Sequence, residues 1–231
     1  MLGFLLLFNR CTDTKNQYTI SGNTMGTTYL IKIVTSDNNH KAGSIKKSID
    51  SLLIELNKQM STWDPESEIS KFNGWNSKVP FVVSDDFLNV VKKSITISRN
   101  TGGLFDPTVY DLMSLWGFGP NPRSGFPNIE DVYRVLEHTG IGQIEVTDSV
   151  LVKSNKMCKL DLNAIAKGYG VDKIFELLNQ RGFNNIFVEI GGEVKCIGKN
   201  IKNKSWSIGI EDPSDDGNYQ KNISAIISVV N

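Results

Sequence analysis

The segment Asp161-Leu-Asn-Ala-Ile-Ala-Lys-Gly-Tyr-Gly-Val-Asp172 joins a polar loop to the beginning of a helix. We expect the loop to occupy residues 161–169 and the helix to occupy residues 169–181. Free N–H groups at a helix start favour a phosphate, and Lys167 adds a positive charge at that point. The segment lacks the spaced glycines of a P-loop. A capping aspartate beside a surface lysine is the structural alternative.

Strand and helix patterns lie on both sides of this segment. Strand patterns occupy residues 18–35 (two short strands around 22–26), 144–160 (a hairpin), 185–190, 193–197, 206–210 and 223–230. Helical patterns occupy residues 45–60, 66–73, 85–101 with Ser84 as N-cap, and 128–138. Antiparallel strand pairs mixed with helices favour an α+β fold, with mixed or antiparallel sheets packed by helices, over a doubly wound sheet.

Composition excludes several classes of function. The 231 residues include 25 basic and 25 acidic side chains, so there is no basic excess for nucleic acid, and we expect no nucleic-acid partner. The cysteines, Cys11, Cys158 and Cys196, are far apart, and the histidines are only His40 and His138. A zinc site or a histidine-based triad is therefore disfavoured. A bound metal should be hard and oxygen-ligated, such as Mg²⁺.

The N-terminus resembles the end of a secretory signal. Residues 2–8 form an apolar run that is too short to span a bilayer, and Cys11 follows closely. We expect residues 1–17 to be a lipoprotein-like signal and tether, with Cys11 lipidated, and residues 18–231 to form one domain. The expected location is the cell envelope, on the periplasmic side of the inner membrane. A mis-assigned start codon or a frayed tail is the alternative.

Further motifs carry side chains suited to a flat, hydroxyl-bearing ligand. Met25 offers a soft apolar face in a glycine-flanked turn, and Trp63 offers a ring that stacks on adenine or isoalloxazine. Asp106, in Gly102-Gly-Leu-Phe-Asp-Pro107, places one carboxylate on a rigid turn, and Glu193 follows a double glycine. The structural alternatives are a core methionine, a tryptophan over a helix end, a capping aspartate and an exposed strand carboxylate.

In this order and spacing the motifs resemble the ApbE-type FAD:protein FMN transferases, also known as flavin-trafficking lipoproteins. The resemblance extends from about residue 18 to residue 213. Its matching segments are residues 24–27, 60–63, 67–73, 103–108, 116–119, 161–172 and 191–192. It implies an ApbE-like α+β fold and export with a lipid anchor, in agreement with the N-terminus.

The resemblance also implies a set of site residues. FAD would contact Met25, Trp63, Leu104, Phe105, Asp106, Asp161 and Lys167. Ala164 would ligate Mg²⁺ through its backbone. Trp63 stands where the family often has Tyr, a change that preserves stacking.

The implied activity is Mg²⁺-dependent transfer of FMN from FAD to a Thr or Ser hydroxyl, with release of AMP. The acceptor would be a flavin-bearing subunit of a membrane redox complex. Two alternatives stay open: a pyrophosphatase that splits FAD into FMN and AMP, and a non-catalytic FAD-binding protein. A mass increase on a target peptide separates transfer from hydrolysis.

One departure from the family concerns the C-terminus. The family continues with a Thr-Ser-Gly segment, a His-Ile-Asp-Pro-type segment and a late Asp and Thr that ligate Mg²⁺, and none of these follows Val230. The apolar strand at residues 223–230 is also expected to lack a partner. We therefore expect the C-terminal part of the domain to be missing, the chain to be a fragment, and the candidate catalytic base to lie beyond Asn231.

Overall fold

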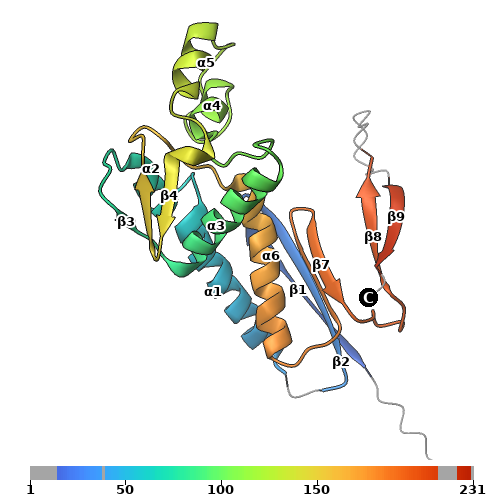
Figure 1. Ribbon diagram of the computed structural model, residues 1–231. Helices are drawn as coiled ribbons and strands as arrows, with labels where there is room; N and C mark the ends of the chain where they lie inside the picture. The colour runs from blue at the N-terminus through green and yellow to red at the C-terminus, as the bar shows by residue number, and fades with distance from the viewer. Residues whose placement is uncertain (1–14, 38–39, 213–222, 230–231) are drawn as a thin grey trace, which may run out of the picture.

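The computed structural model describes residues 15–37, 40–212 and 223–229. The predicted lipidation site at Cys11 lies outside these residues. Within these ranges the chain builds three antiparallel sheets and several helices, which confirms the predicted α+β class (Figure 1). In the described part of the chain, no helix has both the length and the apolar character needed to cross a bilayer.

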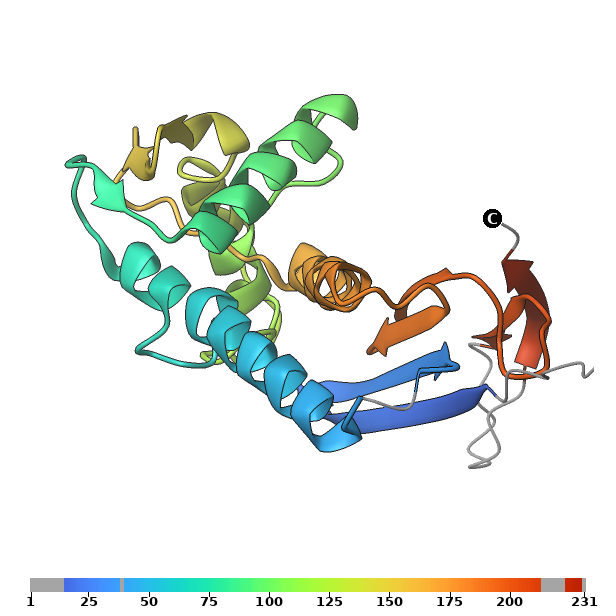
Figure 2. The same ribbon diagram turned by 90° about the horizontal axis from the view of Figure 1, so that it is seen from below.

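The larger sheet is four-stranded, in the order β1-β2-β6-β7. Its strands are β1 (Asn16–Thr24), β2 (Thr27–Thr35), β6 (Ile186–Ile190) and β7 (Glu193–Ile197). Helices α1 (Ala42–Met60) and α6 (Asn163–Gln180) lie along one face of it (Figure 2). Alternating apolar residues of β2 and β6 meet the apolar faces of both helices in one buried core.

A second core lies at the C-terminal end of α1 and the N-terminal end of α6. It is covered by α2 (Glu68–Gly74), α3 (Asp85–Asn100) and a three-stranded sheet of β3 (Phe81–Val82), β5 (Val150–Lys153) and β4 (Ile144–Thr147). From this core the chain projects outward as α4 (Tyr110–Leu115) and α5 (Ile129–Leu136) (Figure 1), and the short helix η1 (Ile141–Gln143) then leads directly into β4. α6 contributes buried residues to both cores and so joins them.

The last two strands form a separate ribbon. β8 (Trp206–Glu211) pairs with β9 (Ile223–Val229), so the prediction that the final strand lacks a partner was wrong. The ribbon is attached to the larger sheet through Trp206, whose indole N–H donates to the Ile197 carbonyl at 2.9 Å and whose ring contacts Phe187. Seven residues of apolar sequence could not identify this pairing, because the partner depends on the tertiary arrangement.

Two predicted boundaries also change. The loop predicted at residues 22–26 narrows to the two-residue turn Met25–Gly26, because β1 and β2 stay in register up to the pair Thr24 and Thr27. Helix α6 begins at Asn163, six residues before the predicted start at Tyr169. Glycine lowers helix propensity only modestly, and burial against the sheet outweighs that cost.

Ser84 occupies the predicted N-cap position of α3 but does not cap it with its side chain. Its hydroxyl donates instead to Glu68 at 2.6 Å, and its backbone N–H donates to the other oxygen of the same carboxylate at 2.6 Å. The residue therefore ties α2 to the start of α3.

We expect Gly22→Ala to destabilise the fold. A Cβ at residue 22 would stand 2.7 Å from the ring of Tyr29, which is the cross-strand partner of Gly22 and is 1% exposed. A rigid buried ring cannot move aside, so we expect a loss of about 1–3 kcal/mol in the free energy of unfolding. Urea unfolding measures it. Gly43→Ala is the control, since a Cβ there meets nothing within 4 Å, and an equal loss in both variants would contradict the prediction.

Acid should weaken the contact between β2 and α1. Burial raises the pKa of Asp50, but hydrogen bonds from Tyr29 (2.5 Å) and Lys46 (3.1 Å) outweigh it and lower the pKa below its usual value. The carboxylate therefore stabilises the fold at neutral pH, and this contribution disappears as the pH falls through about 4 and below.

The expected consequence is that Asp50→Asn lowers the melting temperature at pH 7 but less at pH 3. The control is Glu55→Gln on the same helix, which removes only an exposed ion pair with Lys58. A difference between wild type and Asp50→Asn that does not change with pH would refute the assignment.

Candidate functional site

A cavity of about 350 Å³ lies at the start of α6, between the β1–β2 turn and the end of α1. Met25, Trp63 and Lys167, three of the seven predicted FAD contacts, line it from three separate elements. The other lining residues come from the β1–β2 turn, from α1 with the loop after it, and from α6: Gly26, Leu56, Asn57, Met60, Ser61, Asn163 and Ala166. The fold thus brings together residues that are up to 142 positions apart in the sequence (from 25 to 167).

Met25 is held in a backbone conformation that suits glycine better. Its φ is 49°, and with Gly26 at 72° it forms a turn of the type that matches the twist of a hairpin. For an unbranched side chain this conformation costs on the order of 1 kcal/mol. The turn directs Met25 onto α6, where its methyl group would lie 3.4 Å from a Cβ built on Gly170.

Lys167 lies in the second turn of α6, and its ammonium pairs with Glu193 at 3.0 Å. The turn before Glu193 packs against the lysine stem: a Cβ on Gly191 would stand 3.2 Å from the Lys167 Cδ and 2.7 Å from the Thr27 methyl. Both side chains are partly exposed, so the ammonium remains open to a ligand. The helix start adds a partial positive charge, and the two together favour an anion.

Trp63 stands at the mouth of this cavity with 66% of its surface exposed. Its loop is fixed by Ser67, whose hydroxyl donates to the Ser61 carbonyl at 2.7 Å and accepts from the Ser70 N–H at 3.1 Å as the N-cap of α2. The loop is therefore rigid while the indole face is free. An exposed indole on a fixed loop suits stacking on a planar ligand.

Asp106 and Asp161 are close to each other but do not line the cavity. The Asp161 N–H donates to the Pro107 carbonyl at 2.7 Å, which joins the two segments. The Asp106 carboxylate accepts from the N–H and hydroxyl of Thr108, and Asp161 accepts from the N–H and side chain of Asn163. Both carboxylates thus make the local turn contacts of a capping aspartate, and both remain partly exposed.

Leu104, Phe105 and Ala164 also lie outside the lining of this cavity. Leu104 is 94% exposed, and Phe105 is half-buried. Ala164 is the second residue of α6. The predicted metal ligand therefore belongs to a helix, whereas the prediction placed its carbonyl in a loop, and helical carbonyls already accept an N–H four residues on. The described residues include no group of three His, Cys, Asp or Glu that could hold a metal.

A second cavity, of about 430 Å³, shares the Trp63 wall with the first. Thr62, Tyr110 and Lys159 line it, together with residues of α2 and the loop after α4. The sequence pattern gave no sign of these three residues. Thr62 is adjacent to the predicted Trp63, but only the structure shows that its hydroxyl is buried, and Lys159 and Tyr110 meet there through tertiary packing.

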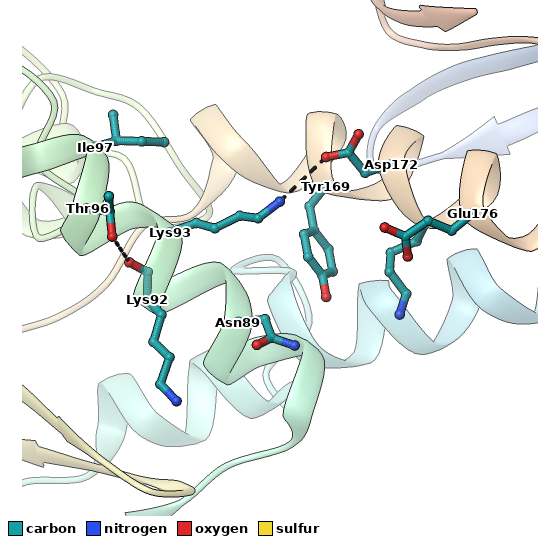
Figure 3. A pocket seen from close by; sticks show the side chains of 9 residues that line it. Asn89, Lys92, Lys93, Thr96, Ile97, Tyr169, Asp172 and Glu176 are labelled. Atoms are coloured by element: carbon teal, nitrogen blue, oxygen red, sulfur yellow. Dashed lines mark hydrogen bonds and ion pairs between the residues drawn. The ribbon is translucent and has the colours of Figure 1, made fainter. Parts of the chain in front are cut away.

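A third cavity, of about 590 Å³, lies between α3 and α6 (Figure 3). Three of its charged side chains are in ion pairs between α3 and α6: Lys93 with Asp172 at 3.5 Å, and Lys173 with Asp86 at 3.1 Å. Burial and a hydrogen bond to Asp86 raise the pKa of Tyr169. None of the predicted site residues lines this groove, so the pairing fits a structural contact between the two helices.

Several known proteins are similar to this chain over most of its length. A family model described as the ApbE family matches residues 25–231. The chain is 40% identical over 227 residues to the FAD:protein FMN transferase of Vibrio cholerae, covering 98% of this chain and 67% of that protein. It is 37% identical over 230 residues to the FAD:protein FMN transferase of Haemophilus influenzae, covering 96% and 65%.

Solved structures of ApbE proteins have a similar fold. The flavin transferase ApbE from Vibrio cholerae has a TM-score of 0.84 at 40% identity, covering 90% of this chain and 68% of that one. The ApbE protein of Thermotoga maritima has a TM-score of 0.78 at 28% identity, covering 93% and 68%. The chain spans about two thirds of the length of the relatives it matches. The family-model match and the 40% identity to a FAD:protein FMN transferase together show that this chain belongs to the ApbE family.

Proposed function

We propose that this chain carries the FAD site of a FAD:protein FMN transferase. The observation that carries the proposal is the meeting of Met25, Trp63 and Lys167 in one cavity at the start of α6. An apolar face and a stacking ring suit the flat rings of a flavin dinucleotide, and a cation beside a helix start suits its diphosphate. The names of the relatives support the same donor.

The proposed reaction transfers the FMN group of FAD from its AMP half to a protein hydroxyl. The oxygen of an acceptor Ser or Thr attacks the phosphorus on the FMN side, forming one P–O bond. The bond from that phosphorus to the bridging oxygen breaks, and AMP leaves with the electron pair. The proton of the hydroxyl passes to a base, which we propose lies outside this chain.

The chain's own residues position the donor. Lys167 and the N–H groups at the start of α6 would hold the diphosphate, while Glu193 keeps the lysine at the cavity. Trp63 would stack on a ring and exclude water from one face of it. Fixed charges of this kind stabilise the extra negative charge of the transition state without having to reorganise.

Mg²⁺ is part of the proposal, although the described residues do not complete a site for it. Asp161 would offer a carboxylate oxygen, the Ala164 carbonyl would have only its second lone pair to offer because it accepts within α6, and the phosphates of FAD would supply further oxygens. Bound there, the ion would neutralise phosphate charge. We further propose that the acceptor is a flavin-bearing subunit of a membrane redox complex, reached from the periplasmic side of the inner membrane.

We expect Lys167→Met to weaken FAD binding roughly 10- to 100-fold, the range for a lost charge-assisted hydrogen bond. Flavin fluorescence titration measures the affinity. Lys173→Met is the matched control, because Lys173 is on the same helix but pairs with Asp86 outside the cavity. Equal losses in the two variants, or none in Lys167→Met, would contradict the assignment of Lys167 to the diphosphate.

Removal of divalent metal should abolish transfer. We expect EDTA to stop FMN attachment to an acceptor domain, and excess Mg²⁺ to restore it, as followed by the mass of the intact acceptor. The same assay separates the alternatives. Free FMN and AMP with an unmodified acceptor would indicate a pyrophosphatase, and FAD that stays intact would indicate a binding protein. Attachment that continues without metal would overturn the Mg²⁺ dependence.

A further inference from the structure

Lys153 is a buried lysine without a carboxylate partner. It is the last residue of β5, and only 1% of it is exposed. Its ammonium donates to the Asn73 carbonyl at 3.4 Å and lies 4.6 Å from the centre of the Phe72 ring, and no described carboxylate forms an ion pair with it. Lysines are almost never fully buried unless they are paired. Costs of this kind are tolerated mainly where function requires them, so the contacts of Lys153 indicate its role.

The contact with Asn73 places the ammonium at the C-terminal end of α2. Asn73 is the second-last residue of this helix, where backbone carbonyls have no partner within the helix. A cation there satisfies a carbonyl and complements the helix dipole. Because α2 has only seven residues, its own hydrogen bonds give its end little support, and Lys153 holds that end from β5.

Asn73 in turn holds the segment that leads into α6. Its side-chain N–H donates to the Leu160 carbonyl at 2.8 Å, and its side-chain oxygen accepts from the Leu160 N–H at 2.7 Å. Asn73 is 7% exposed and Leu160 is fully buried, so water cannot replace these two bonds. One buried amide thus fixes the backbone of a residue that is 87 positions further along the chain.

Asp161 extends these contacts into the candidate site. Its N–H donates to the Pro107 carbonyl at 2.7 Å, and its carboxylate accepts at 2.8 Å from the N–H of Asn163, the first residue of α6. The start of α6 and Lys167 form the anion site to which the proposed function assigns the diphosphate. A displacement of the segment before Asp161 would therefore move the groups that bind the ligand, and such small displacements are costly.

We propose that Lys153 and Asn73 are positioning residues of the FAD site. The protonated Lys153 fixes the end of α2, and Asn73 then fixes Leu160, so that Asp161 and the start of α6 stand where FAD binds. The inference rests on FAD being the donor substrate. Lys153 lines neither of the two cavities that share the Trp63 wall, so it acts through Asn73.

The charge of Lys153 makes this arrangement sensitive to pH. Burial is the main cause that lowers the pKa of Lys153, to about 8; Lys159 acts in the same direction, and Cys158 and Asp111 oppose it. Burial also raises the pKa of Cys158 to about 12, so its thiol stays neutral. As the pH rises through about 8, the ammonium becomes an amine and its bond to Asn73 weakens. The fold itself gains stability above that pH, because the folded pKa lies below that of an exposed lysine.

Lys153→Met tests the inference, because it keeps the length of the side chain and removes the charge. We expect the variant to bind FAD roughly three- to tenfold more weakly at pH 7, the range for one lost hydrogen bond. Wild-type affinity should fall between pH 7 and pH 9, whereas that of the variant should stay constant, as measured by flavin fluorescence titration. Lys156→Met is the control, since Lys156 is an exposed lysine in the loop after β5.

Thermal unfolding separates positioning from a merely structural role. The melting temperature of Lys153→Met at pH 7 should equal or exceed that of the wild type, because an unpaired buried charge is replaced by an apolar side chain. FAD affinity should fall nevertheless. A loss of melting temperature in parallel with the loss of affinity would reduce Lys153 to a structural role and overturn the inference.

Hydrogen exchange followed by NMR supplies a readout that needs no ligand. In Lys153→Met the Leu160 N–H should exchange faster than in the wild type, and the Val188 N–H in β6 should exchange at the same rate. Unchanged exchange at Leu160, or faster exchange with unchanged FAD affinity, would overturn the inference. FAD binding without FMN transfer, in contrast, bears on the proposed function alone, because neither affinity nor exchange requires turnover.

Discussion

The close packing of α6 against the larger sheet is the contact on which the rest of the structure depends. A Cβ on Gly170 would stand 3.2 Å from Ile190 of β6 and 3.4 Å from Met25, so the absence of a side chain there lets the helix approach. The first part of α6 (Ala166, Tyr169) belongs to one core and the later part (Ile174, Leu178) to the other. The helix therefore fixes the two cores relative to each other, and its start is the natural place for a site.

Two tight turns at one end of the larger sheet bring polar and apolar side chains to the start of α6. The register pairs Tyr29 with Ile190, so the turn before β2 and the turn after β6 lie at the same end. The first carries Met25 and the second leads to Glu193. The Gly191 N–H donates to the Thr28 carbonyl at 3.1 Å, which locks the second turn to β2. This backbone contact holds the turn that leads to Glu193, whose carboxylate pairs with the Lys167 ammonium at 3.0 Å.

The sequence was sufficient for what depends on local pattern. The helices at residues 45–60 and 85–101, most strands and the α+β class follow from hydrophobic period and capping residues. The sequence was insufficient where contacts with residues far away in the chain determine the bounds or the pairing of an element. The start of α6 at Asn163 depends on burial that overrides two glycines, and β9 needs β8. Met25, Trp63 and Lys167 could be named through a resemblance, whereas Thr62 and Lys159 are distinguished only by a buried hydroxyl and a cavity wall.

Local costs in the fold indicate the same region without reference to any relative. In the described part of the chain, three non-glycine residues have positive φ: Met25, Asp148 and Asn203. Asp and Asn adopt that conformation readily, but methionine does not. Among the few buried side-chain atoms without a partner there are the Thr62 hydroxyl and one oxygen of Glu193, the residue paired with Lys167. A strained backbone or an unpaired polar group persists where the free energy of ligand binding offsets its cost. Met25, Thr62 and the Lys167–Glu193 pair adjoin two cavities that share the Trp63 wall, whereas the unpaired hydroxyl of Ser94 in α3 lines neither of them.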